Sequence, residues 1–513
     1  MLLYKVGIIK GVYQVIGNAY VLVVIGILLA KCLGFFRDIF FASVFGASNL
    51  TDIYFQVFSL ASLIFTGIGE ALSTLIIKNL NKAENLGAEK QKAYVSHFIT
   101  KTAVTVLLVT GVLYIFSGPL VNLLLPGLSP ELYKTAVHTM YIMLPSCLFV
   151  IISYIMSGVL QNNKVFFVTS IMSLPYNVII IGALLFKDIS ITAVSVVTTI
   201  GWFLHIVILL PQFIKKGYSL FGRLKSENKS DGKNREILYI FISSMMFQLV
   251  FMIDKASVSQ DIGSASTVNY ASNLFVTIAS VFVVAMSRVS YPSICRHFES
   301  GDITQVKSIV RYIITVLMAI FVPFILTVTC FGKDIISMLY QRGEFTKEMS
   351  DTTAILFCIY SFGIFGYVCQ ELFNKILYLD SKYKYTVASA VIVVALKPVI
   401  NLFAVKTGGT LAVALMTTVM FCMYAVFIFT CVGKTIGKYV NMSLIKNVSK
   451  ILLSGLLALI VYFAFSLSGL SVFNSNFGFI ILLGACGLVY IIALALTGSI
   501  KYIIKPNLDK AGN

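Results

Sequence analysis

Residues 190–212 read SITAVSVVTTIGWFLHIVILLPQ, and residues 215–236 read KKGYSLFGRLKSENKSDGKNRE. The first stretch contains no Asp, Glu, Lys or Arg, and a helix of about 20 apolar residues is long enough to cross the hydrocarbon core of a bilayer. The second stretch is polar and basic, which is typical of loops on the cytoplasmic side of a membrane. Together they predict a membrane-spanning helix followed by a cytoplasmic segment.

The same pattern extends over the whole chain. Hydrophobic residues make up 58% of the 513 residues and charged residues only 12%, which is about half the charged fraction of a water-soluble protein. We therefore predict an all-α polytopic membrane protein. Segments of spanning length number about fourteen, and they lie near residues 12–44, 53–77, 98–117, 134–158, 165–186, 190–212, 237–259, 268–291, 308–331, 351–378, 384–405, 409–432, 447–468 and 476–498.

Basic residues fall on alternate connections between these segments, which predicts the orientation of the chain. The basic connections lie near residues 78–92, 164, 215–235, 296–307, 382–384, 434–446 and 501–510. Because Lys and Arg are enriched on the cytoplasmic side, we expect both termini to be cytoplasmic. The net charge of +18 is spread over these loops without an interleaved aromatic patch, so we expect no nucleic-acid partner.

Patterns typical of catalysis or metal binding are missing from the sequence. The nine cysteines form no C-x-x-C pair, and the four histidines share no ligand spacing. There is no phosphate-cradling glycine loop, nucleophile elbow or H-E-x-x-H motif. We therefore expect neither an enzyme nor a bound cofactor. Coupling to an ion gradient or to the membrane potential is left open, since one charge crossing 100 mV is worth roughly 2.3 kcal/mol.

An internal repeat organises the chain. Arg37-Asp38, followed by Gly46-Ala47-Ser48 and then Asp52, is echoed by Asp254-Lys255, followed by Gly263-Ser264-Ala265-Ser266 and Asn269. Leu174-Pro175-Tyr176-Asn177 likewise corresponds to Lys397-Pro398-Val399-Ile400-Asn401. Copies of six helices start on the same side and are parallel, with a central cavity between them. The predicted units are an N-lobe (1–214, helices 1–6), a cytoplasmic linker (215–236), a C-lobe (237–440, helices 7–12), and helices 13 and 14 with a tail (441–513).

Charged residues inside the spans mark candidate sites, because each costs several kcal/mol unless it meets a polar cavity or a partner. They are Lys31, Arg37, Asp38, Glu70, Asp254, Lys255, Glu371 and Lys375. One interpretation places them on a positively charged cavity suited to a phosphate or diphosphate. The other makes Arg37 with Asp38, and Glu371 with Lys375, structural ion pairs. Lys397, beside Pro398, either is a ligand or extends to the membrane surface, and the sequence does not decide between the two.

At these residues the chain resembles the MurJ/MviN family, the lipid II flippases of the MOP transporter superfamily. The likeness is carried by Leu33-Gly34-Phe35-Phe36-Arg37-Asp38, Phe45-Gly46-Ala47-Ser48, Thr51-Asp52, Gly67-Ile68-Gly69-Glu70, Tyr291-Pro292 and Leu339-Tyr340-Gln341-Arg342-Gly343-Glu344-Phe345-Thr346. The resemblance implies a bacterial plasma-membrane flippase. Such a protein moves an undecaprenyl-diphosphate-linked cell-wall precursor to the outer leaflet by alternating access, with a cationic cavity and a lateral groove at the last two helices.

The chain also departs from this family pattern. Lys31 keeps the charge of a family arginine but not its bidentate fork, and Phe65 and Thr66 stand where many members carry arginines. Asn273 matches a further family arginine. The candidate substrate-binding residues are Lys31, Arg37, Asp38, Asp52, Glu70, Asp254, Lys255 and Asn273.

Two other functions stay open at this point. One is a flippase for another polyprenyl-linked glycan, because the cavity is predicted to be less cationic than in many members. The other is a small-molecule exporter of the same superfamily, against which the two extra C-terminal helices argue. The expected partners are a lipid-linked oligosaccharide diphosphate, membrane lipids and cell-wall synthesis proteins.

Overall fold

A computed structural model describes residues 18–82, 87–186, 188–222, 239, 248–380, 382–467 and 478–500. All the regular elements in these ranges are helices, as predicted. The predicted linker is described only as far as residue 222, and the C-terminal tail from residue 501 lies outside the described residues.

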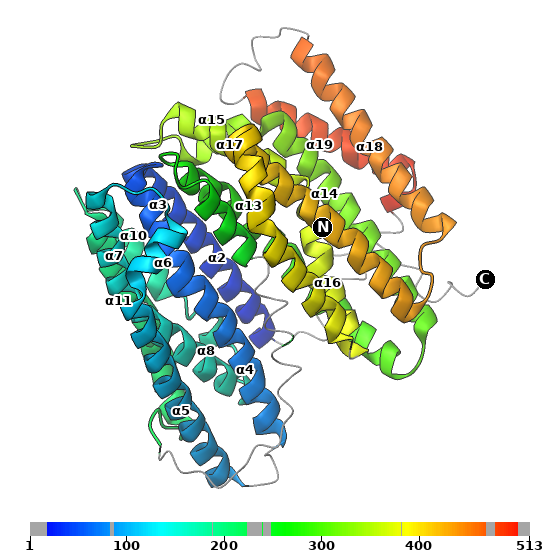
Figure 1. The fold of residues 1–513 in the computed structure, drawn as a ribbon. Coiled ribbons are helices and arrows are strands. Elements are labelled where there is room, and N and C mark those ends of the chain that lie inside the picture. Colours follow the sequence, from blue (N-terminus) through cyan, green and yellow to red (C-terminus); the bar gives the residue numbers. More distant parts are fainter. Residues whose placement is uncertain are drawn as a thin grey trace.

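The N-lobe occupies one side of the molecule (Figure 1). Its first helix, α2 (Asn18–Phe45), crosses toward the end predicted to face outward, where α3 (Asn49–Phe58) turns back. A short π-helix, η2 (Ser59–Ile64), joins α3 to α4 (Phe65–Lys82), so the second predicted span is irregular in its middle. The rest of the lobe comprises α5 (Ala88–Ile115), α6 (Ser117–Leu124), α7 (Pro130–Met143), α8 (Ser146–Asn162), α9 (Phe167–Ser170), α10 (Leu174–Leu184) and α11 (Ile191–Lys215).

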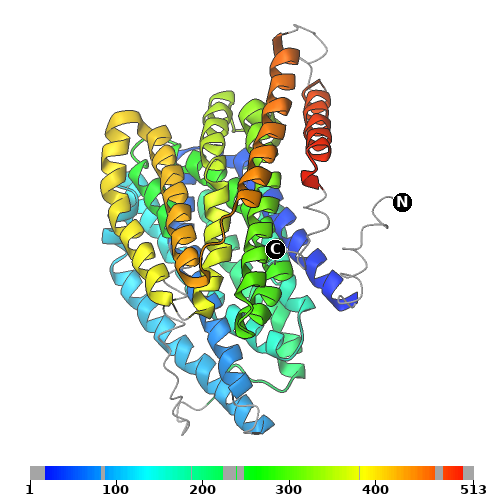
Figure 2. The same cartoon turned by 90° about the vertical axis from the view of Figure 1, so that its right-hand side faces the viewer.

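The C-lobe lies beside it and repeats this order of helices. Residues 248–257 are helical and precede α13 (Ser264–Glu299), which pairs with the long α14 (Ile303–Tyr340). The lobe continues through α15 (Lys347–Ser361), α16 (Ile364–Leu379) and α17 (Tyr383–Ile436). The last two helices, α18 (Met442–Leu467) and α19 (Gly478–Leu496), pack on the outside of α14 (Figures 1 and 2).

The predicted spans agree with these helices wherever the chain is described. Nine helices in the described ranges are long and apolar enough to cross a membrane, and α15 with α16 forms a further span bent by 47°. The 54-residue α17 contains the two predicted spans 384–405 and 409–432, because its backbone leaves the helical region at Gly408 and Gly409. Residues 237, 238 and 240–247 of the predicted span 237–259 lie outside the described residues, so the total of fourteen stays a prediction.

Contacts between the lobes are concentrated at one end. The principal packing across the boundary joins α2 and α3 to α13 and α14, and in Figure 1 α3 lies beside α13 at the upper end. This is the end at which α2 finishes and α3 begins, so the predicted topology assigns it to the outer face. The arrangement leaves the lobes in contact on the outer side.

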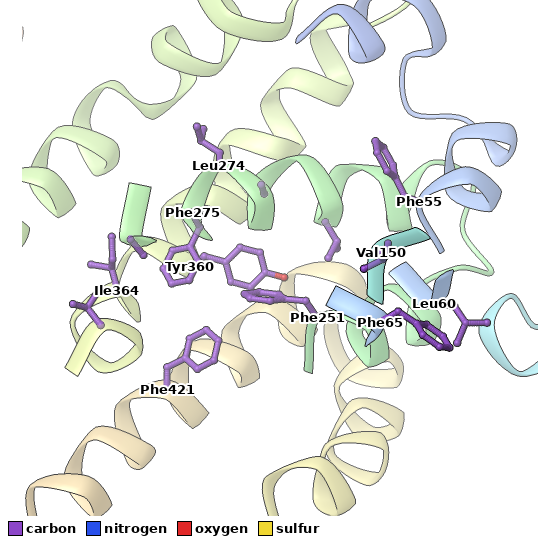
Figure 3. Close-up of a cluster of buried hydrophobic side chains, with 14 of the residues drawn as sticks. Phe55, Leu60, Phe65, Val150, Phe251, Leu274, Phe275, Tyr360, Ile364 and Phe421 are labelled. Atoms are coloured by element: carbon purple, nitrogen blue, oxygen red, sulfur yellow. The ribbon is translucent and has the colours of Figure 1, made fainter. Parts of the chain in front are cut away.

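Aromatic side chains of both lobes are buried near this boundary (Figure 3). In the C-lobe, Phe251 packs edge-on against Tyr360 and Phe421, with centroids 5.6 and 5.8 Å apart, and Phe275 stacks on Phe421. In the N-lobe, Phe55 and Phe65 flank the π-helix and are buried. Lipid-facing helices gain nothing by burying apolar surface from lipid, so close packing of this kind is what holds them together.

Candidate functional site

Asp52, at the start of α3, joins the two lobes at the end predicted to face outward. Its carboxylate accepts hydrogen bonds from the backbone N–H of Gly263 (3.0 Å) and of Ser266 (2.6 Å), and from the Ser266 hydroxyl. These N–H groups belong to the first turn of α13, which lacks a side-chain cap of its own. Asp52 therefore caps a helix of the opposite lobe, where a carboxylate also complements the helix dipole.

Backbone contacts complete this junction, which we call the interlobe seal. It comprises Ser43, Gly46, Ala47 and Asp52 of the N-lobe with Gly263, Ser266, Tyr270, Gly343, Glu344 and Met349 of the C-lobe. The Tyr270 hydroxyl donates to the Gly46 carbonyl (3.1 Å), and the Glu344 N–H donates to the Ser43 carbonyl (2.9 Å). The Ala47 N–H donates to the Met349 sulfur (3.3 Å).

Two glycines let the lobes approach this closely. Gly263 and Gly343 both have positive φ, at 75° and 57°, a conformation that side chains rarely permit. A Cβ atom at Gly263 would lie 2.4 Å from the Ala47 carbonyl oxygen, and one at Gly343 would lie 2.1 Å from that of Ser43. The glycines of both sequence motifs are therefore needed for backbone contact across the boundary.

Lys255 forms a contact across the boundary between the lobes, deeper in the protein than the interlobe seal. Its buried ammonium donates to the hydroxyl of Ser59, the first residue of the π-helix, and to Asn269 Oδ1 (3.2 Å). The neighbouring Asp254 turns the other way and is buried inside the C-lobe, in contact with α17. The sequence places these two charges side by side, whereas the structure assigns them to different networks.

Arg37 and Asp38 form an ion pair on α2. Arg37 Nη2 and Nε donate to Asp38 Oδ1 at 2.7 and 3.0 Å, and Nη1 donates to Asn177 Oδ1 at 3.3 Å. The guanidinium also lies 5.4 Å from the centroid of the Tyr176 ring. The side chain of Arg37 is 18% exposed. Three of its five N–H groups are used by these bonds.

Lys31 and Asn273 lie on facing helices below the seal. Lys31 Nζ donates to the Ser280 hydroxyl of α13 at 2.8 Å, a bond from one lobe to the other. Asn273 precedes Ser280 by two helical turns, so both occupy one face of α13, and Asn273 is half-buried. Along α2, Arg37 lies about 12 Å and Lys31 about 21 Å from Phe45. The two cationic residues are therefore at different depths.

A second charged group lies deeper still, between α2, α4 and α16. Glu70 is exposed and interacts electrostatically with Glu371 across the lobe boundary and with Lys31. Lys375 interacts with Glu371 but donates its hydrogen bond to Ser287 (2.6 Å). Among the described residues neither glutamate forms an ion pair within 4.0 Å. The predicted Glu371–Lys375 pair is thus a longer-range interaction, unlike Arg37–Asp38.

The structure therefore divides the eight predicted site residues into groups. Lys31 and Glu70 interact with the opposite lobe, and Asn273 lies on the same face of α13 as the Lys31 partner Ser280. Arg37 and Asp38 pair with each other inside the N-lobe, Asp52 and Lys255 hold the lobes together, and Asp254 is internal to the C-lobe. The sequence did not predict Ser59, Ser280 or Asn177 as partners of the charged residues. For Asn177 the internal repeat gave an indication, because it pairs the Pro-containing motif of Asn177 with that of Asn401.

A cavity of about 60 Å³ lies between α14, α18 and α19. It is lined mainly by apolar side chains and by Tyr462 and Tyr490, with Pro323 at the α14 side. Tyr490 donates to the Ala319 carbonyl (2.8 Å) and Tyr462 to that of Cys330 (3.2 Å). These bonds fix the last two helices to the C-lobe, so the cavity has a defined wall.

Solved structures with this arrangement of helices are transporters. A structure of lipid II flippase MurJ in an inward closed conformation superposes with a TM-score of 0.77 at 22% identity, covering 94% of this chain and 99% of that one. An inward-facing multidrug resistance MATE family transporter of the MOP superfamily superposes with a TM-score of 0.61 at 12% identity, over 82% of this chain. The fold is thus that of MOP superfamily transporters.

Sequence relatives extend over most of the chain. A probable lipid II flippase MurJ of Buchnera aphidicola subsp. Schizaphis graminum is 24% identical over 74% of this chain and 76% of its own length. One from Rhizobium tropici is 21% identical over 93% of this chain and 92% of its own, and lipid II flippase MurJ of Burkholderia cenocepacia is 23% identical over 78% and 81%. The family model described as lipid II flippase MurJ matches residues 41–484, and the chain belongs to this family.

Proposed function

We propose that this protein translocates lipid II, an undecaprenyl-diphosphate-linked cell-wall precursor, from the inner to the outer leaflet of the bacterial plasma membrane. The observation that carries the proposal is the arrangement of the two lobes. They are joined at the predicted outer end by the interlobe seal, and below it Lys31 and Glu70 interact with the C-lobe, with Arg37 on the same helix as Lys31. Family membership supports the choice of substrate.

The contacts that cross the boundary between the lobes define how access can alternate between the two sides of the membrane. Opening the outer side requires the bonds of Asp52, Tyr270 and Glu344 to break, because each joins one lobe to the other. Closing the inner side brings α4 and α16 together, and these carry Glu70 and Glu371. A substrate that binds between the lobes shifts this equilibrium only by its difference in affinity for the two states.

Arg37 is the proposed ligand for the diphosphate. Its fork-shaped guanidinium is suited to phosphate oxygens, and the N–H groups not used by Asp38 and Asn177 are available to donate hydrogen bonds to them. Asp38, Asn177 and Tyr176 orient the guanidinium from one side. Lys31, deeper in the same space, supplies a second positive charge. The acidic Glu70 and Glu371 make this surface mixed in charge, which suits a head group that carries both anionic and cationic parts.

The cavity between α14, α18 and α19 is the proposed site for part of the polyprenyl chain. Its apolar lining matches a hydrocarbon chain. This assignment also separates the proposal from a small-molecule exporter, which has no need for an apolar cavity at two additional helices. We further propose that the protein is a transporter without catalytic activity, with both termini in the cytoplasm and cell-wall synthesis proteins as neighbours.

Depletion of the protein in its own cells tests the proposal. Lipid II is expected to accumulate on the cytoplasmic leaflet while the total amount of other polyprenyl-linked glycans stays constant. Mass spectrometry of the accumulated lipid identifies the head group. Accumulation of a different polyprenyl-diphosphate glycan would reassign the substrate, and no accumulation of any lipid-linked glycan would refute the flippase function.

A further inference from the structure

Lys397 lies in the middle of the C-lobe with its side chain fully buried, and it does not extend to the membrane surface. Its ammonium has three N–H donors, and three oxygen atoms surround it. Asp254 Oδ1 lies at 2.6 Å, Thr417 Oγ1 at 2.7 Å and Asn401 Oδ1 at 2.8 Å. All three partners are buried as well. We call these three residues the oxygen cage.

The three residues of the oxygen cage hold one another in place. Asn401 Nδ2 donates to Asp254 Oδ1 (2.8 Å) and to Ser257 Oγ (3.0 Å), and the Thr417 hydroxyl donates to Asp254 Oδ2 (2.6 Å). Asp254 comes from the helical residues 248–257, Asn401 from the first half of α17 and Thr417 from its second half. The oxygens are therefore pre-arranged around one point by three separate helical segments.

The surroundings of the cage are dry and aromatic. Phe251 lies one turn before Asp254 and Phe421 one turn after Thr417, and their rings pack together 5.8 Å apart (Figure 3). An unpaired carboxylate at such a place is strongly unfavourable, because a buried charge without a counter-charge costs several kcal/mol. A positive charge at the centre of the cage is thus a requirement of the fold.

We propose that the Lys397 ammonium is a tethered cation in an oxygen-lined site that takes a dissolved monovalent cation when the amine is removed. The cage supplies a carboxylate, an amide carbonyl oxygen and a hydroxyl, the oxygen donors that hard metal ions prefer. Its single negative charge matches Na⁺ or K⁺ and leaves a divalent ion uncompensated. Because Lys397 is covalently attached, the wild-type cage cannot exchange its cation between the two sides of the membrane.

The test compares thermal unfolding of the purified full chain in NaCl, KCl and choline chloride at equal ionic strength. The wild type is expected to unfold at the same temperature in all three. Lys397→Ala is expected to unfold about 5–10 °C lower in choline chloride, since it leaves Asp254 buried without a partner. Adding NaCl or KCl should then raise its unfolding temperature progressively, as binding of a ligand to the native state does. Lys406→Ala, at an exposed lysine of the same helix, is the matched control and should show no such dependence.

A second variant keeps the proposal testable if Lys397→Ala does not fold. Asp254→Asn combined with Lys397→Ala removes both charges, and this double variant should fold and show the same unfolding temperature in every salt. The proposal is overturned if the single variant has an equal deficit in all three salts. It is also overturned if the single variant shows no deficit, or if the double variant still responds to NaCl or is not recovered folded.

Discussion

Asp52→Ala should destabilise the closed outer side more than any other single change in the seal. The substitution removes an acceptor of three hydrogen bonds, two from backbone N–H groups and one from the Ser266 hydroxyl. Hydrogen bonds to a charged group contribute about 1.5–3 kcal/mol each, and loss of a helix cap costs about 1 kcal/mol. Because the bonds share one carboxylate and are not additive, we expect a total of about 2–4 kcal/mol.

This free energy is specific to one state, since Asp52 bonds to the opposite lobe only while the seal is closed. At about 1.4 kcal/mol for each factor of ten, the equilibrium should shift toward the outward-open state roughly 30- to 700-fold. A minor state populated at about 10% would then become the major one, and one populated at about 0.1% would rise to roughly 3–40%. Asp52→Asn keeps one carbonyl acceptor and should produce a smaller shift.

Pulsed electron spin resonance in lipid measures this shift directly. Spin labels at the exposed Leu50 and Ile262, one on each lobe beside the seal, should report a longer-distance population in Asp52→Ala. Asp302→Ala is the matched control, because Asp302 caps α14 within the C-lobe through its bond to the Gln305 N–H (3.1 Å). If the distance distribution of Asp52→Ala equals that of the wild type, the seal does not control outward opening.

Three further predictions concern the substrate and the topology. Arg37→Ala should abolish transport per folded molecule, since a contact of about 1.5–3 kcal/mol with the diphosphate is lost, whereas Arg37→Lys should retain part of it. The measurement is transport divided by the amount of protein in the membrane. Normal transport by Arg37→Ala would leave the ion pair with Asp38 as the only role of Arg37. Gly487→Phe should fill the cavity between α14, α18 and α19 and lower transport at unchanged protein abundance. Gly484→Phe is the control, because Gly484 does not line the cavity and both glycines have open space around them. Equal transport by the two variants would exclude the cavity as a lipid site. Cysteines introduced at Asn49 and in the linker, in a background without native cysteines, should be labelled by an impermeant reagent from outside and from inside, respectively, and the reverse result would invert the topology.

Hydrophobicity and loop charge were sufficient to predict the helices, because a bilayer requires each spanning segment to be long, apolar and helical. The break in α17 was also within reach of such reasoning. Gly408 and Gly409 separate two predicted spans, and the structure confirms the break there through their non-helical backbone angles. The π-helix after Phe58 had no signal of this kind, since its sequence Ser59 to Ile64 is as apolar as a regular span.

The partners of the charged residues could not be predicted, because they depend on contacts between distant segments. Lys397 had two open interpretations in the sequence, and only the positions of Asp254 and Asn401, which are 147 residues apart, decide between them. The repeat did carry part of this information. It paired Asn177 with Asn401, and in each lobe that asparagine contacts a charged residue of the first repeat motif, Arg37 or Asp254.

The central claim is that the lobes carry a lipid diphosphate between leaflets, and flipping by purified protein in liposomes tests it most directly. Liposomes containing lipid II that is labelled on its head group are mixed with an impermeant reagent that destroys the label in the outer leaflet. With the wild-type protein the protected inner pool should become accessible over time, and with Arg37→Ala at equal protein content it should stay protected. If the wild type leaves the inner pool protected under every imposed membrane potential and ion gradient, the protein is not a lipid II flippase.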